Sequence, residues 1–79
     1  MARYYFDTDD GTTVDADDEG VEFPDRDSAK QAALGILAMM VGEKVPIVAA
    51  IGLRVVVRDE AGQPVYRARL DLDGADVGP

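Results

Sequence analysis

DRDSAKQAALGILAMMVG, residues 25–42, is the stretch that decides the fold. Its apolar residues recur every three or four positions, which is the period of an α-helix with one buried face. Helix-start chemistry is offered by Asp25, Asp27 and Ser28. We expect Asp27 or Ser28 to cap a helix over residues 29–41 that ends at Gly42. The predicted buried face consists of Ala29, Ala33, Ile36, Leu37 and Met40.

The apolar surface of this helix is wider than one buried face requires. Leu34, Met39 and Val41 lie outside the predicted stripe, and the run over residues 45–52 after the helix is also apolar. Connecting segments are usually polar, so such a run either packs within the chain or is buried in an interface. We expect a homodimer or a partner protein as the alternative to intrachain packing. The candidate interface residues are Met39, Met40, Val41, Ile47, Val48 and Ile51.

Segments on both sides of the helix have the composition or alternation of β-strands. They are strands over residues 3–7, 53–58 and 65–72, a short return strand over 12–14 and an extended segment over 21–23. Residues 59–64 contain Gly62 and predict the turn of an antiparallel hairpin. We therefore predict an α+β fold, a small antiparallel sheet of three to four strands with one helix packed on one face, in the order β-(β)-α-β-β. One domain should span residues 1–79, with its core over 3–72 and a frayed tail over 73–79.

The composition excludes several classes of protein. With 79 residues and neither cysteine nor histidine, the chain lacks disulfides and the Cys and His ligands of the usual zinc sites. It also lacks a phosphate-binding Gly-Lys motif, and its single serine, Ser28, suits a helix cap, so we expect no enzyme and no cofactor. Glu43, Lys44 and Pro46 interrupt the weakly charged stretch 31–53 before it reaches the roughly 18 apolar residues of a membrane span. The N-terminus has no apolar core of a secretory signal, and we expect a cytoplasmic protein.

The N-terminal third of the chain is strongly acidic, and ten of the sixteen carboxylates lie between Asp7 and Asp27. Residues 15–20 have the 1, 3, 5 spacing and the position-6 glycine of a calcium loop, but Arg26 stands where the closing glutamate belongs. Solvated acidic turns therefore explain the segment better than a metal site, and a basic partner protein is the alternative. The candidate acidic patch is Asp15, Asp17, Asp18 and Glu19.

Strand alternation predicts another surface, on the sheet face that points away from the helix. The residues expected to face the helix are Tyr4, Phe6, Leu53, Val55, Val57, Tyr66, Ala68 and Leu70. The opposite face then carries a candidate sheet-face patch of Arg3, Tyr5, Arg54, Arg58, Arg67 and Arg69. Arginines beside an aromatic ring suit nucleic acid, but the net charge of -8 opposes that attraction. We expect these arginines to pair with Asp7, Asp71, Glu22 or the acidic loop over residues 15–20, or to line an interface with an acidic protein.

Several motifs together resemble a known family of proteins. They are RYYFD at residues 3–7, DEGVEFPD at 18–25, the Ala-rich helix and VRDEAGQPV at 57–65. The stretch 3–72 resembles a family of small uncharacterised alphaproteobacterial proteins grouped as a domain of unknown function. This resemblance implies a bacterial protein, with no activity or site residues to carry over. The strand, acidic turn, proline and helix also resemble the HicB-type antitoxin fold, which implies binding of a toxin.

Composition, patterning and resemblance agree on a protein that binds rather than catalyses. We predict a small non-enzymatic protein-interaction domain that self-associates, with a dimer favoured and no membrane association. One alternative is an antitoxin-like or acidic inhibitor that binds a basic protein. The other is a nucleic-acid-binding domain that uses the sheet-face patch, which the acidic charge disfavours.

Overall fold

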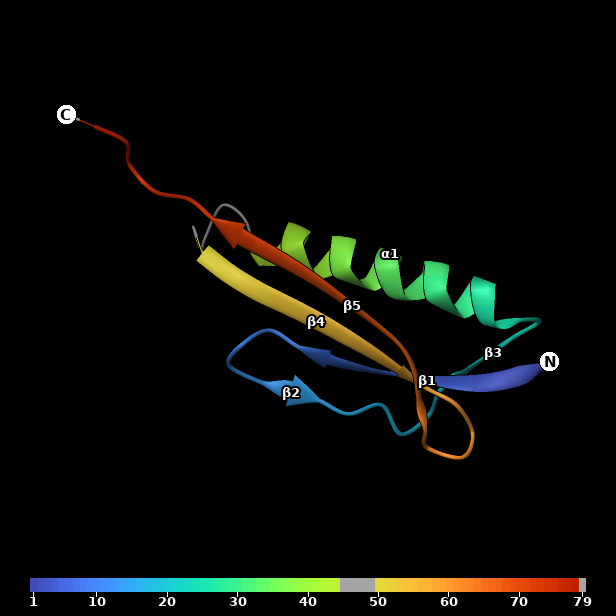
Figure 1. The fold of residues 1–79 in the computed structure, drawn as a ribbon. Coiled ribbons are helices and arrows are strands. Elements are labelled where there is room, and N and C mark those ends of the chain that lie inside the picture. Colours follow the sequence, from blue (N-terminus) through green and yellow to red (C-terminus); the bar gives the residue numbers. More distant parts are fainter. Residues whose placement is uncertain (45–49, 79) are drawn as a thin grey trace.

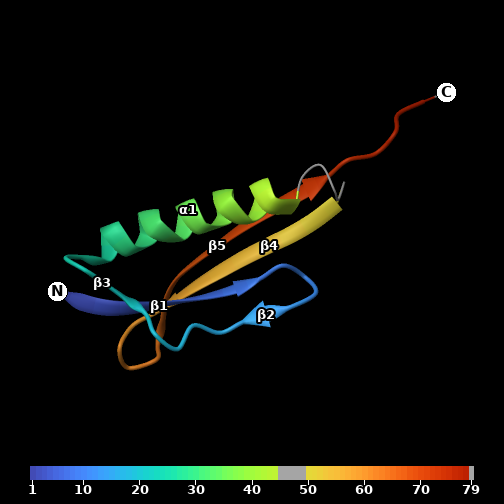
Figure 2. The same cartoon turned by 180° about the vertical axis from the view of Figure 1, so that it is seen from behind.

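The computed structural model describes residues 1–44 and 50–78 of the chain. In these residues one helix lies along one face of a five-stranded antiparallel sheet (Figure 1), and the view from behind shows the same two layers (Figure 2). The elements in chain order are β1 (Ala2–Asp9), β2 (Val14–Asp15), β3 (Val21–Phe23), α1 (Arg26–Lys44), β4 (Ala50–Arg58) and β5 (Pro64–Asp73). The predicted α+β fold is confirmed, and the extended segment at 21–23 pairs as an additional strand.

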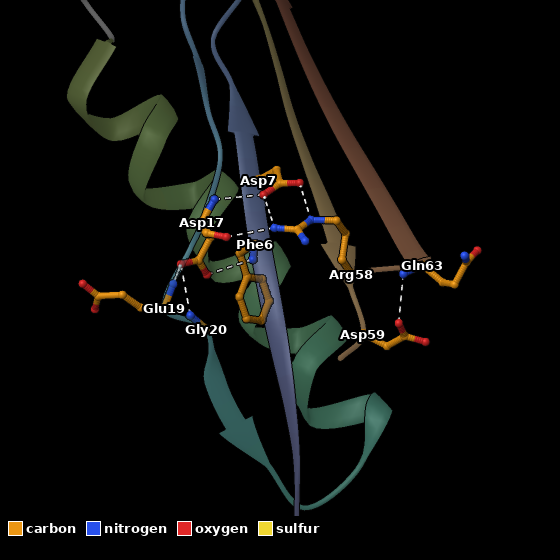
Figure 3. A network of polar contacts seen from close by, with 8 residues as sticks. All are labelled: Phe6, Asp7, Asp17, Glu19, Gly20, Arg58, Asp59 and Gln63. Carbon is orange, nitrogen blue, oxygen red and sulfur yellow. Dashed lines mark hydrogen bonds and ion pairs between the residues drawn. The ribbon is translucent and has the colours of Figure 1, made fainter. Parts of the chain in front are cut away.

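The strands are ordered β2-β1-β4-β5, and every adjacent pair is antiparallel. β3 also pairs with β1, on the side of β1 opposite to β4 (Figure 3). β4 and β5 form the predicted hairpin, with Gly62 in the turn at a positive φ of 81°. The Asp59 carboxylate holds this turn, because it accepts hydrogen bonds of 2.9 Å from the N–H groups of Ala61 and Gln63. The sheet therefore has β1 and β4 at its centre.

The core lies between α1 and the sheet. Its buried members are Tyr4, Phe6, Ala29, Ala33, Leu37, Leu53, Val55 and Val57. Ile36 and Met40 pack at its margin, so the predicted buried face of the helix is confirmed. The alternation of the strands is also confirmed, since Leu70 of β5 lies opposite Leu53 of β4 on the helix side of the sheet. Leu70 is nevertheless 39% exposed, because β5 is the last strand of the sheet.

α1 begins three residues before the predicted start at residue 29, and its cap is Asp25 rather than Asp27 or Ser28. The Asp25 carboxylate accepts a hydrogen bond of 2.8 Å from the Ser28 N–H, which satisfies one of the free donors in the first turn. This hydrogen bond lowers the pKa of Asp25. α1 therefore begins at Arg26, directly after its cap.

α1 also extends beyond its predicted end, because Gly42 does not end the helix. α1 continues to Lys44, and Gly42 is not among the glycines with a positive φ that a C-terminal cap requires. The Lys44 ammonium lies 3.3 Å from the Asp10 carboxylate, which ties the last turn of α1 to the loop after β1. Within residues 1–44 and 50–78, no helix combines the length and the apolar character that a membrane span requires.

The short return strand predicted at residues 12–14 forms later, as Val14–Asp15. The residues before it are held in a turn by Asp10, whose carboxylate accepts hydrogen bonds from the N–H groups of Thr13 and Thr12 at 2.7 and 2.9 Å. Together with the Lys44 ammonium, these bonds lower the pKa of Asp10 to about 2. The Asp10 carboxylate of the acidic N-terminal segment therefore stabilises the turn that connects β1 to β2.

Candidate interaction surfaces

One edge of the sheet is built from two short strands and the loop between them. β2 pairs with residues 8–9 of β1, and β3 pairs with residues 2–4. Between the pairs Thr8–Asp15 and Tyr4–Val21, the edge chain advances six residues while β1 advances four. The two extra residues form a bulge, which bends an edge strand and interrupts its pairing. We call β2, β3 and the loop 16–20 the bulged edge.

The Asp17 side chain provides a hydrogen-bond acceptor where the bulge interrupts the main-chain pairing of β1. Its Oδ2 accepts a hydrogen bond of 3.0 Å from the Phe6 N–H of β1, so a side chain replaces the missing main-chain acceptor (Figure 3). Its Oδ1 accepts from the N–H groups of Glu19 and Gly20 at 3.0 and 3.1 Å. The Asp17 N–H in turn donates to Asp7 Oδ1 at 2.9 Å. Sequence reasoning assigned Asp17 to an exposed acidic patch and missed this structural function.

Arg58 of β4 joins the bulged edge to the centre of the sheet. Its Nε lies 2.7 Å from Asp7 Oδ2, and its Nη2 donates to Asp7 Oδ1 at 3.1 Å and to the Asp17 carbonyl oxygen at 2.8 Å (Figure 3). The guanidinium also lies 5.2 Å from the centre of the Tyr5 ring, within the range of a cation–π contact. This half-buried network therefore connects β4, β1 and the loop 16–20.

The network keeps its carboxylates ionised. Arg58 lowers the pKa of Asp7 by hydrogen bonding, which outweighs the opposing effect of burial, and the Asp17 N–H lowers it further. Burial alone would raise the pKa of Asp17, but hydrogen bonds from the N–H groups of Phe6, Gly20 and Glu19 outweigh it and lower the pKa. The hydrogen bond to Asp7 raises the pKa of Arg58. Both carboxylates are thus negative at neutral pH and belong to the fold.

Gly20 closes the bulge and has no room for a side chain. It adopts a φ of 72°, which L-residues with a side chain rarely adopt. A Cβ at this position would lie 2.9 Å from the Tyr4 carbonyl oxygen, from Arg3 Cγ and from Tyr5 Cε1. The bulged edge therefore requires glycine at this position for both conformation and space.

The sheet-face patch lies on the predicted face, and most of its arginines are paired with carboxylates. Arg3 pairs with Glu22, Arg54 with Asp9, Arg58 with Asp7, and Arg69 with Asp71. Hydrogen bonds from Gly11 and Arg54 lower the pKa of Asp9. The expected intramolecular pairing is confirmed with Glu22, Asp7 and Asp71, whereas Asp9, the partner of Arg54, was not among the expected residues. For Arg67, no ion pair occurs with another described residue.

The acidic patch is divided by the structure. Asp17 points into the network described above, whereas Asp15, Asp18 and Glu19 are exposed. In the described parts of the chain, no group of three or more carboxylates is arranged to hold a metal ion. The exposed members of the patch therefore offer negative charge without a preformed cation site.

The candidate interface is also divided. Met40 and Val41 of α1 and Ile51 of β4 pack against the core, as the intrachain alternative expects. Met39 is 68% exposed, and Leu34, one of the surplus apolar residues, is 51% exposed. Ile47 and Val48 lie outside the described residues. α1 therefore keeps these two large apolar side chains exposed to water, in a stretch from Gln31 to Gly42 that carries no charged residue.

The other edge of the sheet is regular, and sequence reasoning did not single it out. β5 pairs with β4 along one side, and in the described chain no strand pairs with its other side. Pro64 at its start agrees with an edge position, because proline cannot donate to a central ladder. We call β5 the open edge. Its signal in the sequence is RARLDLD at residues 67–73, in which both charges and apolar residues alternate.

Comparison with known proteins identifies the family. A family model matches residues 3–71, from the first strand through α1 to the last strand. Its description is a domain of unknown function, DUF6894, which agrees with the predicted membership of a family grouped as a domain of unknown function. No curated protein and no solved structure matches the chain. The chain therefore belongs to the DUF6894 family, a domain of unknown function.

Proposed function

We propose that this domain is a non-enzymatic protein-interaction domain that self-associates as a homodimer. The observation that carries the proposal is apolar surface that the described residues leave exposed: Leu34, Met39 and Leu70 are 51%, 68% and 39% exposed. A chain with a net charge of -8 is repelled by its own copies, unless the copies meet where charge is absent or balanced. Large apolar side chains that are exposed at such a place favour an interface.

The molar mass in solution tests this proposal. Light scattering on the eluting protein at micromolar concentration should give twice the chain mass of 8.5 kDa. The dimer should persist in high salt, because apolar burial is not screened. A mass equal to one chain at every concentration tested would contradict self-association.

A second candidate function is binding of a basic protein through the acidic patch, as an antitoxin-like inhibitor would do. It is supported by Asp15, Asp18 and Glu19, which are exposed and have no ion pair with a described residue. The resemblance to HicB-type antitoxins and a bacterial, cytoplasmic setting belong to this candidate. Nucleic acid is the partner least supported, because four arginines of the sheet-face patch already pair with carboxylates.

Affinity capture from a bacterial lysate separates this candidate from self-association. The bait variant should change Asp15 and Asp18 to Asn and Glu19 to Gln, and leave Asp17 intact because Asp17 builds the loop. Basic proteins captured by the native chain should be lost with the variant and at high salt. Equal capture by both baits would contradict a function of the acidic patch.

A further inference from the structure

The open edge has a charge pattern that is complementary to itself. On the outer face of β5, Arg67 and Arg69 are followed at the same spacing by Asp71 and Asp73. On the helix face, Ala68, Leu70 and Leu72 alternate with them. An exposed edge strand normally resists pairing with a copy of itself when it carries charges of one sign. β5 changes sign at its midpoint, so an antiparallel copy presents opposite charges.

We infer that β5 of one chain pairs antiparallel with β5 of a second copy, in a register centred on Leu70. This inference rests on the proposed self-association and names its surface. In this register Arg69 faces Asp71 of the second copy, and Arg67 faces Asp73, each twice because of the two-fold symmetry. Leu70 faces its own copy at the axis. The unpaired main-chain groups of both edges then form a ladder across the axis.

Neighbouring registers are disfavoured by charge. A shift of the centre of the register by one residue places Arg69 opposite Arg69 or Asp71 opposite Asp71, and keeps two opposite-charge contacts in place of four. A shift by two residues places Arg67 opposite Arg69 or Asp71 opposite Asp73. Like charges directly opposite one another destabilise a strand pair, and opposite charges stabilise it. The charges of β5 therefore favour the register centred on Leu70 over its neighbours.

The monomer leaves the required residues available. Arg67 and Asp73 form no ion pair with another described residue, and both are exposed. Arg69 and Asp71 contact each other along the strand at 3.1 Å, with side chains 67% and 59% exposed, so water still reaches both. A second copy would extend this exposed pair into an alternating set of charges across the axis.

The helix adds apolar surface on the same side of the molecule. α1 runs beside β5 in the same direction (Figure 1), and the Lys30 ammonium lies 5.7 Å from the centre of the Tyr66 ring of β5. Lys30 thus marks the flank of α1 that faces β5. Leu34 follows four residues later and lies on the same flank. Because the two-fold axis is perpendicular to the joined sheet, both helices lie on one face, and Leu34 and Leu70 of each copy approach the axis.

The arrangement also limits the assembly to two copies. Pairing of the open edges leaves a bulged edge at each end of the joined sheet. Strands of two and three residues, separated by a bulge, offer little regular main chain for another copy. The joined sheet therefore closes as a dimer instead of growing into a fibre.

Charge reversal tests the pairing. Arg67→Asp places two carboxylates opposite each other at both contacts between positions 67 and 73, and Asp73→Arg places two guanidinium groups opposite each other there. Each variant alone should therefore dimerise at least about ten-fold more weakly than the native chain. An equimolar mixture of the two variants restores opposite charges at one of these contacts and removes the like-charge pairs from the other, where the two native residues meet. Native mass spectrometry resolves this mixed dimer by its mass.

Matched controls place the same charge changes elsewhere. They are Arg26→Asp and Asp18→Arg, at exposed positions away from β5. Because these positions lie outside the proposed contact, both controls should keep the native dissociation constant. A loss of dimer in the controls equal to that in the β5 variants would mean that net charge, and not the open edge, sets the affinity, and would overturn the inference.

The outcomes separate this inference from the proposed function. Loss of the dimer in each single β5 variant, together with a mixed dimer in the mixture, supports the open edge as the interface. A native dimer that both reversals leave intact overturns the inference and leaves self-association standing, through another surface such as the part of α1 around Met39. A monomeric native chain overturns both. Far-UV circular dichroism of every variant confirms that each one is folded.

Discussion

The two edges of the sheet differ in whether their main-chain hydrogen-bonding groups are satisfied within the described chain. The bulged edge is short and irregular, and Asp17 satisfies main-chain N–H groups from β1 and from its own loop. The open edge is ten residues long and paired regularly with β4, apart from one irregularity near Arg58. Edge strands are commonly protected by bulges or charge, because an exposed regular edge pairs with other chains. The difference indicates that one edge is built to prevent pairing and the other is available for it.

The largest expected effect comes from breaking the bulged edge at Gly20. Gly20→Ala should lower the free energy of unfolding by about 2–3 kcal/mol, because the added Cβ meets main chain and the φ of 72° is strained. Gly62→Ala is the matched control, since Gly62 has a φ of 81° but nothing within 4 Å of an added Cβ. It should cost about 1 kcal/mol, the strain alone. Urea unfolding followed by circular dichroism measures both, and equal losses would contradict the steric argument.

A smaller loss of stability is expected when the Asp17 side chain, which accepts the hydrogen bond of the Phe6 N–H in place of a main-chain carbonyl, is removed. Asp17→Ala leaves the N–H groups of Phe6, Glu19 and Gly20 without their acceptor, and should lower the free energy of unfolding by about 2 kcal/mol. Asp18→Ala removes the neighbouring exposed carboxylate, which accepts none of these bonds, and should have almost no effect. Faster hydrogen exchange at Phe6 in the Asp17 variant alone would assign the loss to this bond.

The core could be predicted from the sequence, but the hydrogen bonds within the bulged edge could not. The helix and the strands follow from apolar periodicity, and the face of each strand residue follows from alternation, so the core and the sheet-face patch were predicted. The function of Asp17 does not follow from any local pattern. It depends on which segment lies beside β1, and that pairing is set by contacts distant in the sequence. An acidic residue in an acidic run was therefore assigned to the solvated surface.

The same limit explains what was missed at the other edge and in the helix. The alternation over residues 65–72 predicts a strand, but it does not say that β5 is the last strand of the sheet. The pattern RARLDLD at 67–73 indicates a self-complementary edge only when the strand order is known, because the order β2-β1-β4-β5 leaves β5 unpaired on one side. The helix cap was misplaced for a local reason, because Asp25, Asp27 and Ser28 all have capping chemistry and lie within one turn.

The pH dependence of stability sharpens the description of the bulged edge. A carboxylate whose pKa is lowered by folding contributes stability above its unfolded pKa of 3.8, and loses that contribution as the pH falls through its folded pKa. Asp17→Asn should therefore be less stable than the native chain by about 1 kcal/mol at pH 7, since the amide is a weaker acceptor. The difference should shrink as the pH falls below 3.8 and through the lowered pKa of the folded Asp17.

Comparison with a neighbouring residue isolates this effect. The acidic segment repels itself, so acid changes the stability of the whole chain for reasons unrelated to Asp17. Asp18→Asn makes the same change in net charge without touching the Phe6 hydrogen bond. Its free energy of unfolding, measured in urea from about pH 7 to about pH 3, should run parallel to that of the native chain. A parallel curve for Asp17→Asn as well would contradict a specific contribution of its ionised form.

The smallest effect on folding, and the most direct comparison of the edges, comes from one exposed apolar residue on each. Leu70 of the open edge and Val21 of the bulged edge are 39% and 52% exposed. Changing either to Thr keeps a good strand former and should alter the free energy of unfolding of the monomer by about 1 kcal/mol or less. Their effects on association should differ, because only Leu70 lies at the proposed axis. Sedimentation equilibrium should show a several-fold weaker dimer for Leu70→Thr and the native constant for Val21→Thr. Equal weakening by both would mean that self-association does not distinguish the two edges, and that β5 has no special part in it.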